Sequence, residues 1–203
     1  MIDVVIPAHP ARVASGQLDK AIASVWAQTF AARLVVQHDT TRAGSAATRN
    51  AGLARVRSPW VAFLDSDDVL DPGHLEKLAA CAEATRADLV YPWFRADGYH
   101  DPWPHRFKHA FDAAALRRSN YIPVTVLART DLVREVGGFI ADLTIAPPAA
   151  CDEWGLWLRM LDAGARIAHL PERTWTWNMH SGNTSGSPQL GDAKPGWKGP
   201  RRV

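Results

Sequence analysis

The chain has 203 residues, which is enough for one well-packed domain and few for two. Its 23 basic and 21 acidic side chains leave a formal net charge of +2, which argues against nucleic-acid binding by bulk electrostatics. Two cysteines without paired spacing (Cys81 and Cys151), no apolar run near the length of a membrane span and no signal-peptide pattern indicate a cytoplasmic protein without integral membrane contact.

The first part of the chain alternates between strand-like and helix-like segments. Residues 2–8 (IDVVIPA), 33–39 (RLVVQHD) and 60–65 (WVAFLD) are short apolar runs typical of buried strands. Residues 18–30 have apolar side chains at helical spacing, and residues 43–56 form a second helix-like segment rich in small residues. This alternation predicts an α/β fold with a mostly parallel sheet flanked by helices, and a ligand site beyond the carboxyl ends of its strands.

The later part of the chain has a less regular pattern. The remaining predicted elements are helices over residues 71–85, 131–139 and 152–163 and strands over residues 87–94 and 121–130. Gly137 and Gly138 are expected to end the second of these helices, and Gly164 the third. Residues 95–120 are rich in histidine, proline and aromatic side chains and receive no assignment. Residues 183–203 are rich in glycine, proline and basic residues, and we expect a flexible basic tail there.

Three aspartates, Asp65, Asp67 and Asp68, directly follow the third predicted strand. A carboxylate at the edge of a core needs a cation, an arginine or open water beside it. One interpretation is an Asx-rich turn that caps the next helix, and another is a divalent cation held by one or two carboxylates and by a ligand's phosphates. A calcium loop is excluded, because Val69 and Leu70 stand where that loop requires an oxygen ligand and a glycine.

Five segments of the chain resemble glycosyltransferases of family 2, which have the Rossmann-like GT-A fold. The segments VVIPAH, ASVWAQTF, AATRNAGLARVRSPWVAFLDSDD, LVREVGGF and CDEWGLWLRM occur in the order and spacing of that family. The resemblance covers about residues 1–182 and predicts one GT-A domain there. Its nucleotide-sugar-binding half is expected over about residues 1–94 and its acceptor-binding half over about residues 95–182. The resemblance implies a nucleotide-activated sugar as donor, Mn or Mg as cofactor, and inversion at the anomeric carbon.

The aspartate run matches the D-x-D element of this family. The resemblance implies that Asp65 and Ser66 contact the nucleotide sugar and that Asp67 binds the metal, with Asp68 as a weaker candidate. The cation would bridge the diphosphate and neutralise the charge of the leaving group. His180 matches a histidine that completes the metal shell in many members of the family, and its alternative role is that of a structural or exposed histidine.

Further residues match the family's nucleotide-binding positions. Pro7, Ala8 and His9 match the first nucleotide loop, although the asparagine usual in that loop is missing here. Asp39 matches, with a shift of one residue, the aspartate that holds the base of the nucleotide. Arg49 matches the arginine near the nucleotide, and its alternative is a solvated arginine on a helix surface.

The catalytic base of the family is the last acid of a Glu-Asp pair at the start of a late helix. Asp152 and Glu153 occupy this place in inverted order, and we predict Glu153 as the base with Asp152 as the second candidate. The dipole at a helix N-terminus would keep such a carboxylate ionised, as a base must be. The alternative is that both acids merely complete the start of a helix. Trp154 and Trp157 are predicted to lie in the core rather than to stack on a sugar.

These matches predict a metal-dependent, inverting glycosyltransferase that moves one sugar from a nucleoside-diphosphate sugar to a hydroxyl group. A UDP-sugar is the first expectation for the donor, and the acceptor stays open among glycans, proteins, small molecules and modified nucleic acids. One alternative is an inactive nucleotide-sugar-binding protein of the same fold. A nucleotidyltransferase is a weaker alternative, because it needs a basic, glycine-rich loop where this chain offers only Arg12 and Gly16. The oligomeric state is not readable from the sequence.

Overall fold

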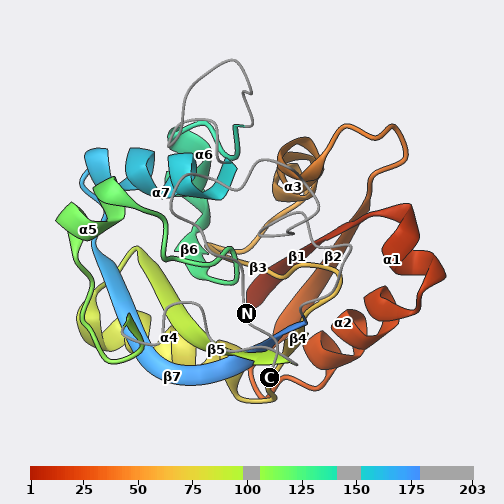
Figure 1. Cartoon of the computed structure of the whole chain (residues 1–203), viewed down its shortest axis with the longest axis horizontal. Coiled ribbons are helices and arrows are strands. Elements are labelled where there is room, and N and C mark those ends of the chain that lie inside the picture. The colour runs from red at the N-terminus through yellow and green to blue at the C-terminus, as the bar shows by residue number, and fades with distance from the viewer. Residues whose placement is uncertain (98–105, 141–151, 179–203) are drawn as a thin grey trace.

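The computed structural model describes residues 1–97, 106–140 and 152–178, which build a seven-stranded sheet with helices on both faces (Figure 1). In sequence order the strands are β1 (Ile2–Ala8), β2 (Ala32–His38), β3 (Trp60–Phe63), β4 (Val69–Leu70), β5 (Leu89–Asp97), β6 (Leu127–Arg129) and β7 (Ile167–Asn178). The helices are α1 (Pro10–Ala14), α2 (Gln17–Trp26), α3 (Ser45–Ala54), α4 (His74–Thr85), α5 (Ala113–Arg118), α6 (Thr130–Glu135) and α7 (Asp152–Asp162). The predicted tail and His180 lie outside the described residues.

The sheet is mixed, and its strand order is β2-β1-β3-β6-β5-β7-β4. The parallel pairs are β1 with β2, β1 with β3, and β5 with β7. Strand β6 runs antiparallel to both of its neighbours, and the short β4 runs antiparallel to β7. The predicted alternation of strands and helices is therefore confirmed, and its parallel pairing holds within β2-β1-β3 and between β5 and β7.

Several predicted boundaries shift in the structure. The expected strand over residues 121–130 is reduced to β6, and the helix expected from residue 71 begins only at His74, after the short β4. The helix α6 is followed by Gly137 and Gly138 with positive φ angles, as predicted for its end. Strand β7 is the longest strand among the described residues and was not predicted, because Pro171 and its charged neighbours interrupt the apolar pattern there.

Helix α3 packs closely on β1, on the same side of the sheet as α6 and α7 (Figure 1). A Cβ atom on Gly52 would lie 2.5 Å from Cγ1 of Val5, so only glycine permits this approach. The Asn50 side chain also exchanges hydrogen bonds with the backbone of Phe139, donating to its carbonyl at 2.7 Å and accepting from its N–H at 2.9 Å. These contacts fix α3 against the sheet and the segment after α6, and they fix the position of Arg49 on the same helix.

Helix α7 is anchored by two buried tryptophans. Trp154 Nε1 donates to the carbonyl of Leu116 at 2.8 Å, and Trp157 Nε1 donates to that of Ile122 at 3.3 Å. Both side chains belong to the hydrophobic core, so the predicted core role is confirmed. The first turn of α7 is thereby held in place, and it carries the acidic pair. None of the described helices has the length and apolarity required to cross a bilayer.

Candidate functional site

The side chain of Arg49 on α3 connects two acidic segments that are far apart in the sequence. Its Nη2 donates to Oδ1 of Asp65 at 2.7 Å, and its Nη1 donates to Oδ2 of Asp152 at 2.6 Å. Its guanidinium group also lies over the ring of Phe139, 5.3 Å from the centroid. We call Arg49, Asp65, Asp152 and Glu153 the Arg49 network. It joins the D-x-D element to the predicted base pair.

The Arg49 guanidinium is held as a buried cation. Only 7% of its side chain is exposed, so the alternative of a solvated helix arginine is wrong. Burial opposes the charge, but the nearby carboxylates of Asp65, Asp152 and Glu153 outweigh this effect and raise the pKa of Arg49. Both terminal nitrogens are engaged by carboxylates, so Arg49 positions the two acidic segments in this structure.

The two acids at the start of α7 have opposite environments. Burial disfavours the charge of Asp152, but hydrogen bonding with Glu153 and the charge of Arg49 outweigh it and lower the pKa of Asp152. The hydroxyl group of Ser45 donates a further hydrogen bond to Asp152 at 2.9 Å. Asp152 is therefore the ionised member of the pair.

Glu153 is the member of the pair whose pKa is raised. Burial, and then the hydrogen bond and negative charge of Asp152, raise its pKa. Its contact with Asn120, whose Nδ2 lies 3.3 Å from Oε1 of Glu153, does not compensate a full charge. Burial and the like charge of Asp152 oppose the helix dipole, which is expected to favour the ionised form of this carboxyl group. A group of this kind takes up a proton readily once it has lost one.

The D-x-D loop between β3 and β4 presents its acids in different directions. The side chain of Asp65 is 36% exposed and contacts Arg49, whereas Ser66 is buried. The carboxylate of Asp67 forms an ion pair with Arg12 on α1, in which Nε of Arg12 lies 3.1 Å from Oδ2 of Asp67. Asp67 and Asp65 therefore each pair with an arginine from a different helix.

Asp68 holds the D-x-D loop in place. Its side chain is buried and accepts the backbone N–H of Asn178 at 2.9 Å, while Nδ2 of Asn178 donates to the backbone carbonyl of Asp67 at 2.5 Å. Burial, together with the charges of Asp65 and Asp67, raises the pKa of Asp68 well above its usual range. These contacts fasten the D-x-D loop to the end of β7 and turn Asp68 away from the role of a metal ligand.

The predicted nucleotide loop lies at the carboxyl end of β1. Pro7 and Ala8 are the last residues of β1, and Ala8 is buried. Nδ1 of His9 accepts the N–H of Ala11 at 3.2 Å and so caps α1. These three residues stand beside the end of β2, because the N–H of Asp39 donates to the carbonyl of Ala8 at 2.9 Å.

Asp39 closes the loop that leads into α3. Its two carboxylate oxygens accept the N–H groups of Ala43 at 2.8 Å and Gly44 at 3.0 Å. The hydrogen bond from Ala43, and further backbone hydrogen bonds of this loop, lower the pKa of Asp39. The carboxylate is thus ionised and shapes the loop at the edge where the nucleotide is expected.

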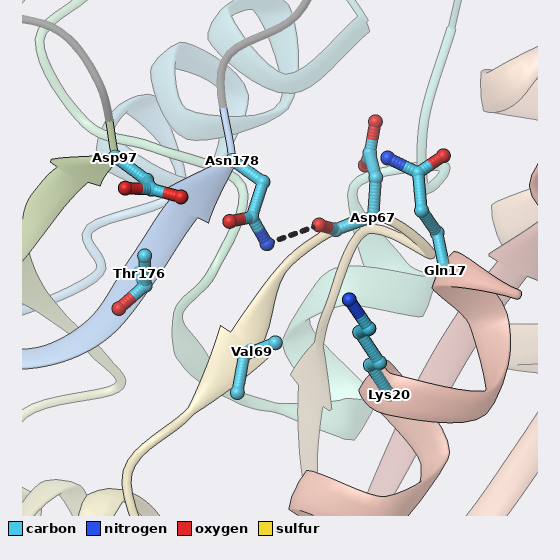
Figure 2. A pocket seen from close by; sticks show the side chains of 7 residues that line it. All are labelled: Gln17, Lys20, Asp67, Val69, Asp97, Thr176 and Asn178. Carbon is cyan, nitrogen blue, oxygen red and sulfur yellow. Dashed lines mark hydrogen bonds between the residues drawn. The ribbon is translucent and has the colours of Figure 1, made fainter.

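A pocket of about 510 Å³ opens on the other side of Asp67, between α2 and the ends of β5 and β7 (Figure 2). The residues that line it are Gln17, Lys20, Asp67, Val69, Asp97, Thr176 and Asn178. We call it the Asp67 pocket. Its volume is typical of small-molecule sites, and six of its seven lining residues, all except Val69, have polar or charged side chains. Apart from Asp67, these residues could not be predicted from sequence patterns, because a single lysine such as Lys20 on a helix has the pattern of an ordinary surface residue.

The groups around Asp67 could bind a hard divalent cation such as magnesium. No group of three or more potential ligands among His, Cys, Asp and Glu occurs in the described part of the chain. Magnesium and similar hard cations are commonly held by one or two carboxylates, with water and substrate phosphates as the other ligands. Asp67 fits such a site, because its carboxylate lines an open pocket that has room for phosphates.

Comparisons with known proteins identify similar glycosyltransferases. A model of the family described as glycosyl transferase family 2 matches residues 14–135. A pre-mycofactocin glycosyltransferase of Mycobacterium tuberculosis is 32% identical over 147 residues, which are 67% of this chain and 30% of that protein. An uncharacterized glycosyltransferase of Bacillus subtilis, YwdF, is 32% identical over 108 residues, which are 49% of this chain and 40% of that protein. The matched regions thus span less than half the length of these relatives.

Solved structures of TarS from S. aureus have the same fold. The structure of its residues 1–349 with UDP-GlcNAc superposes with a TM-score of 0.72 and 18% identity, over 90% of this chain and 59% of that one. The corresponding structure with UDP gives a TM-score of 0.67 and 18% identity, over 89% of this chain and 61% of that one. At this level of identity the similarity establishes a shared fold.

Proposed function

From the premise that the chain belongs to glycosyl transferase family 2, we propose that it transfers one sugar from a nucleoside-diphosphate sugar to an acceptor hydroxyl group, with inversion. A UDP-sugar is the proposed donor, because the structural neighbour TarS was solved with UDP-GlcNAc and with UDP. Residues 1–94 would provide most of the nucleotide-sugar side and residues 95–182 most of the acceptor side.

The Arg49 network is the observation that carries this proposal. Sugar transfer needs a group that binds the donor and a base that receives the proton of the acceptor, at a short and fixed separation. Arg49 bonds to Asp65 on one side and to Asp152, the neighbour of Glu153, on the other. A rigid, buried contact of this kind favours catalysis over simple ligand binding, because a binding protein has no need for a protonatable carboxyl group beside the donor site.

Glu153 is the proposed base. Once deprotonated, its carboxylate would accept the proton of the acceptor hydroxyl, while the oxygen forms a bond to the anomeric carbon and the bond from that carbon to the phosphate oxygen breaks. The proton ends on Glu153 and the electron pair leaves with the nucleoside diphosphate. The raised pKa of Glu153 favours proton uptake at this step, whereas the lowered pKa of Asp152 makes it the weaker base.

Asp67, with His180 as a further proposed ligand outside the described residues, would bind Mn or Mg. A divalent cation bound here would supply charge compensation for the diphosphate. Asp65 and Ser66 would hold the donor beside it, and Pro7, Ala8, His9 and Asp39 would form the nucleotide side of the site. Arg49 would act by positioning Asp65 and Asp152.

The experiment that tests the proposal measures thermal stability with nucleoside diphosphates and nucleotide sugars, each with and without Mn. A ligand at a hundred times its dissociation constant stabilises the folded state by about 2.7 kcal/mol, which raises the melting temperature by several degrees. We expect a UDP-sugar to stabilise the protein with Mn, and Asp67→Ala to lose the effect of Mn. The stabilising nucleotide sugar is then used in a transfer assay with candidate acceptors. No stabilisation by any nucleotide, with or without Mn, would contradict the proposed function.

A further inference from the structure

The Asp67 pocket contains a lysine whose position the family resemblance did not anticipate. Lys20 and Gln17 are one turn apart on α2 and lie on the same side of that helix. In Figure 2 they project from α2 into the pocket, across from Asp97, Thr176 and Asn178. Among the described residues Lys20 has no ion-pair partner within 4.0 Å, although it shares the pocket with two carboxylates. Its ammonium group is therefore available for a ligand.

A second cation, Arg12 on α1, forms an ion pair with Asp67. The side chain of Arg12 is only 17% exposed and its Nε lies 3.1 Å from Oδ2 of Asp67. Arg12 thus pairs with Asp67, and Lys20 lines the pocket that Asp67 also lines. The charges of Arg12 and Lys20 balance those of Asp67 and Asp97, so the pocket is close to neutral without a ligand. A divalent cation that arrives with the two negative charges of a nucleoside-diphosphate sugar would leave it neutral again.

We propose that Arg12 and Lys20 form a protein-supplied binding site for the phosphate oxygens of the donor, next to Asp67. The inference rests on the proposed function and extends it to residues on α1 and α2. The pocket has the volume for a diphosphate and is lined by Lys20 and by the neutral hydrogen-bond donors Gln17 and Asn178. Arg12 is not part of the lining and joins the site through its ion pair with Asp67. Arginine and lysine are the side chains that bind phosphate oxygens most strongly.

The ion pair between Arg12 and Asp67 gives this site a specific consequence. A metal ion that binds the Asp67 carboxylate competes with Arg12 for the same oxygen. The Arg12 guanidinium group, displaced from that oxygen, can then bind the phosphate that accompanies the metal. The exchange predicts that Arg12 weakens the binding of a metal ion alone and strengthens the binding of a diphosphate. A purely structural ion pair would show only the first of these effects.

The test measures binding of inorganic pyrophosphate in EDTA, of UDP and of uridine by isothermal titration calorimetry. Lys20→Ala is expected to weaken pyrophosphate and UDP binding by about threefold to fivefold, the size of an exposed ion pair, and to leave uridine binding unchanged. Lys20→Arg keeps the charge and is expected to restore the affinity. Lys77→Ala is the matched control, because Lys77 is a surface lysine that pairs with Glu172 outside the pocket.

Arg12→Ala supplies the second measurement. It is expected to weaken pyrophosphate and UDP binding, and to tighten binding of Mn alone, measured by the electron paramagnetic resonance signal of free Mn. Pyrophosphate and UDP binding unchanged in both Lys20→Ala and Arg12→Ala would overturn the inference, as would a wild-type protein that does not bind pyrophosphate in EDTA. If the wild type instead binds no nucleotide under any condition, the proposed function fails first, so the two failures are distinguishable.

Discussion

Asp3 and Glu153 are two inward-lying carboxyl groups with different environments. Asp3 lies at the edge of the sheet formed by the amino ends of its central strands, and Glu153 lies at the edge formed by their carboxyl ends. Asp3, near the amino end of β1, accepts hydrogen bonds from Arg33, from the N–H groups of Arg57 and Ser58 and from the Ser58 hydroxyl. Burial opposes its charge, but these hydrogen bonds outweigh it and hold its pKa far below the usual range. Glu153, beside the carboxyl ends of the strands, accepts a hydrogen bond from Asn120 and lies next to the negative Asp152. The charge of Arg49 favours its ionised form, but burial and Asp152 outweigh this effect and raise its pKa.

This difference distinguishes a carboxylate that stabilises the fold from a carboxyl group that is suited to proton transfer. Both carboxylate oxygens of Asp3 accept hydrogen bonds, which stabilise its ionised form and disfavour protonation. The raised pKa of Glu153 favours its protonated form, so this carboxyl group can gain and lose a proton more readily than Asp3. An arginine lies near each of the two acids, Arg33 at Asp3 and Arg49 at Asp152 beside Glu153, so an arginine alone does not distinguish the two cases. The number of hydrogen-bond donors that contact each carboxyl group distinguishes them.

The largest expected effect concerns Glu153→Gln. Glutamine has nearly the shape of the protonated glutamic acid that the folded protein holds, so folding and donor binding should be retained. Removal of a general base typically lowers the rate about 10²- to 10⁴-fold. The measurement compares transfer rates and donor affinity for Glu153→Gln and for Glu83→Gln, an exposed glutamate on α4 that serves as control. Full transfer activity in Glu153→Gln would remove Glu153 from the role of base.

Arg49→Met should cause the next largest effect, this time on stability. The substitution leaves Asp65 and Asp152 close to one another without their shared cation, and loss of one partner of a buried pair costs about 3–5 kcal/mol. Arg33→Met is the matched variant at the other edge. Arg33 is 34% exposed and Asp3 keeps its backbone donors, so its loss should cost less, about 1–2 kcal/mol. Denaturant unfolding of both variants measures the difference, and equal losses would contradict the role given to Arg49.

Asp3→Asn tests the structural edge directly. An amide group cannot accept all the hydrogen bonds that the carboxylate accepts, and we expect a loss of about 2 kcal/mol in the free energy of unfolding. Nucleotide binding by the folded fraction should not change, because Asp3 lies at the opposite edge from the D-x-D loop. A loss of nucleotide affinity comparable with that of Asp67→Ala would show that the two edges are coupled.

The pH dependence of stability should have opposite signs at the two carboxyl groups. The pKa of Asp3 is lowered in the folded state, so its contribution is present above the unfolded pKa and is lost as the pH falls through the acid range. The pKa of Glu153 is raised, so its contribution is present below an unfolded pKa of about 4.3 and is lost as the pH rises towards its folded value. Glu153→Gln should therefore become more stable than wild type at alkaline pH, by roughly 1 kcal/mol. Melting temperatures between acid and alkaline pH test this, and parallel curves for the two proteins would contradict it.

Much of the fold follows from local sequence patterns. The apolar runs that became β1, β2 and β3 and the helical spacing of α2 and α7 are visible because each segment has a single period. Strand β7 was missed because Pro171, Glu172 and Arg173 interrupt its pattern, and its pairing with β5 is irregular at the same place. Long-range pairing stabilises this strand against its weak local signal.

The candidate site was predictable in its residue types and not in its contacts. The D-x-D element stands out because its carboxylates follow an apolar segment, whereas the acidic pair is indicated by the resemblance to family 2. That Arg49 contacts both of them depends on the close packing of α3 on β1, which a sequence does not reveal. The proton on Glu153 is equally hidden, because the burial and the like charge that raise its pKa arise only from tertiary packing. Lys20 and Arg12 join the site for the same reason, through the fold of α1 and α2.

The smallest expected effect is at a pair that belongs to neither edge of the sheet. Nζ of Lys77 lies 2.6 Å from Oε2 of Glu172, and about half of each side chain is exposed, with values of 49% and 48%. Exposed pairs of this kind contribute about 0.2–1 kcal/mol, because water screens the charges and two long side chains must be ordered. Lys77→Ala should therefore change the free energy of unfolding by less than about 1 kcal/mol, and by less still at high salt. Denaturant unfolding at low and high salt measures it. A loss as large as that of Arg33→Met would mean that short ion-pair distances alone predict stability in this fold, and that the number of donors and the degree of burial do not separate the two edges.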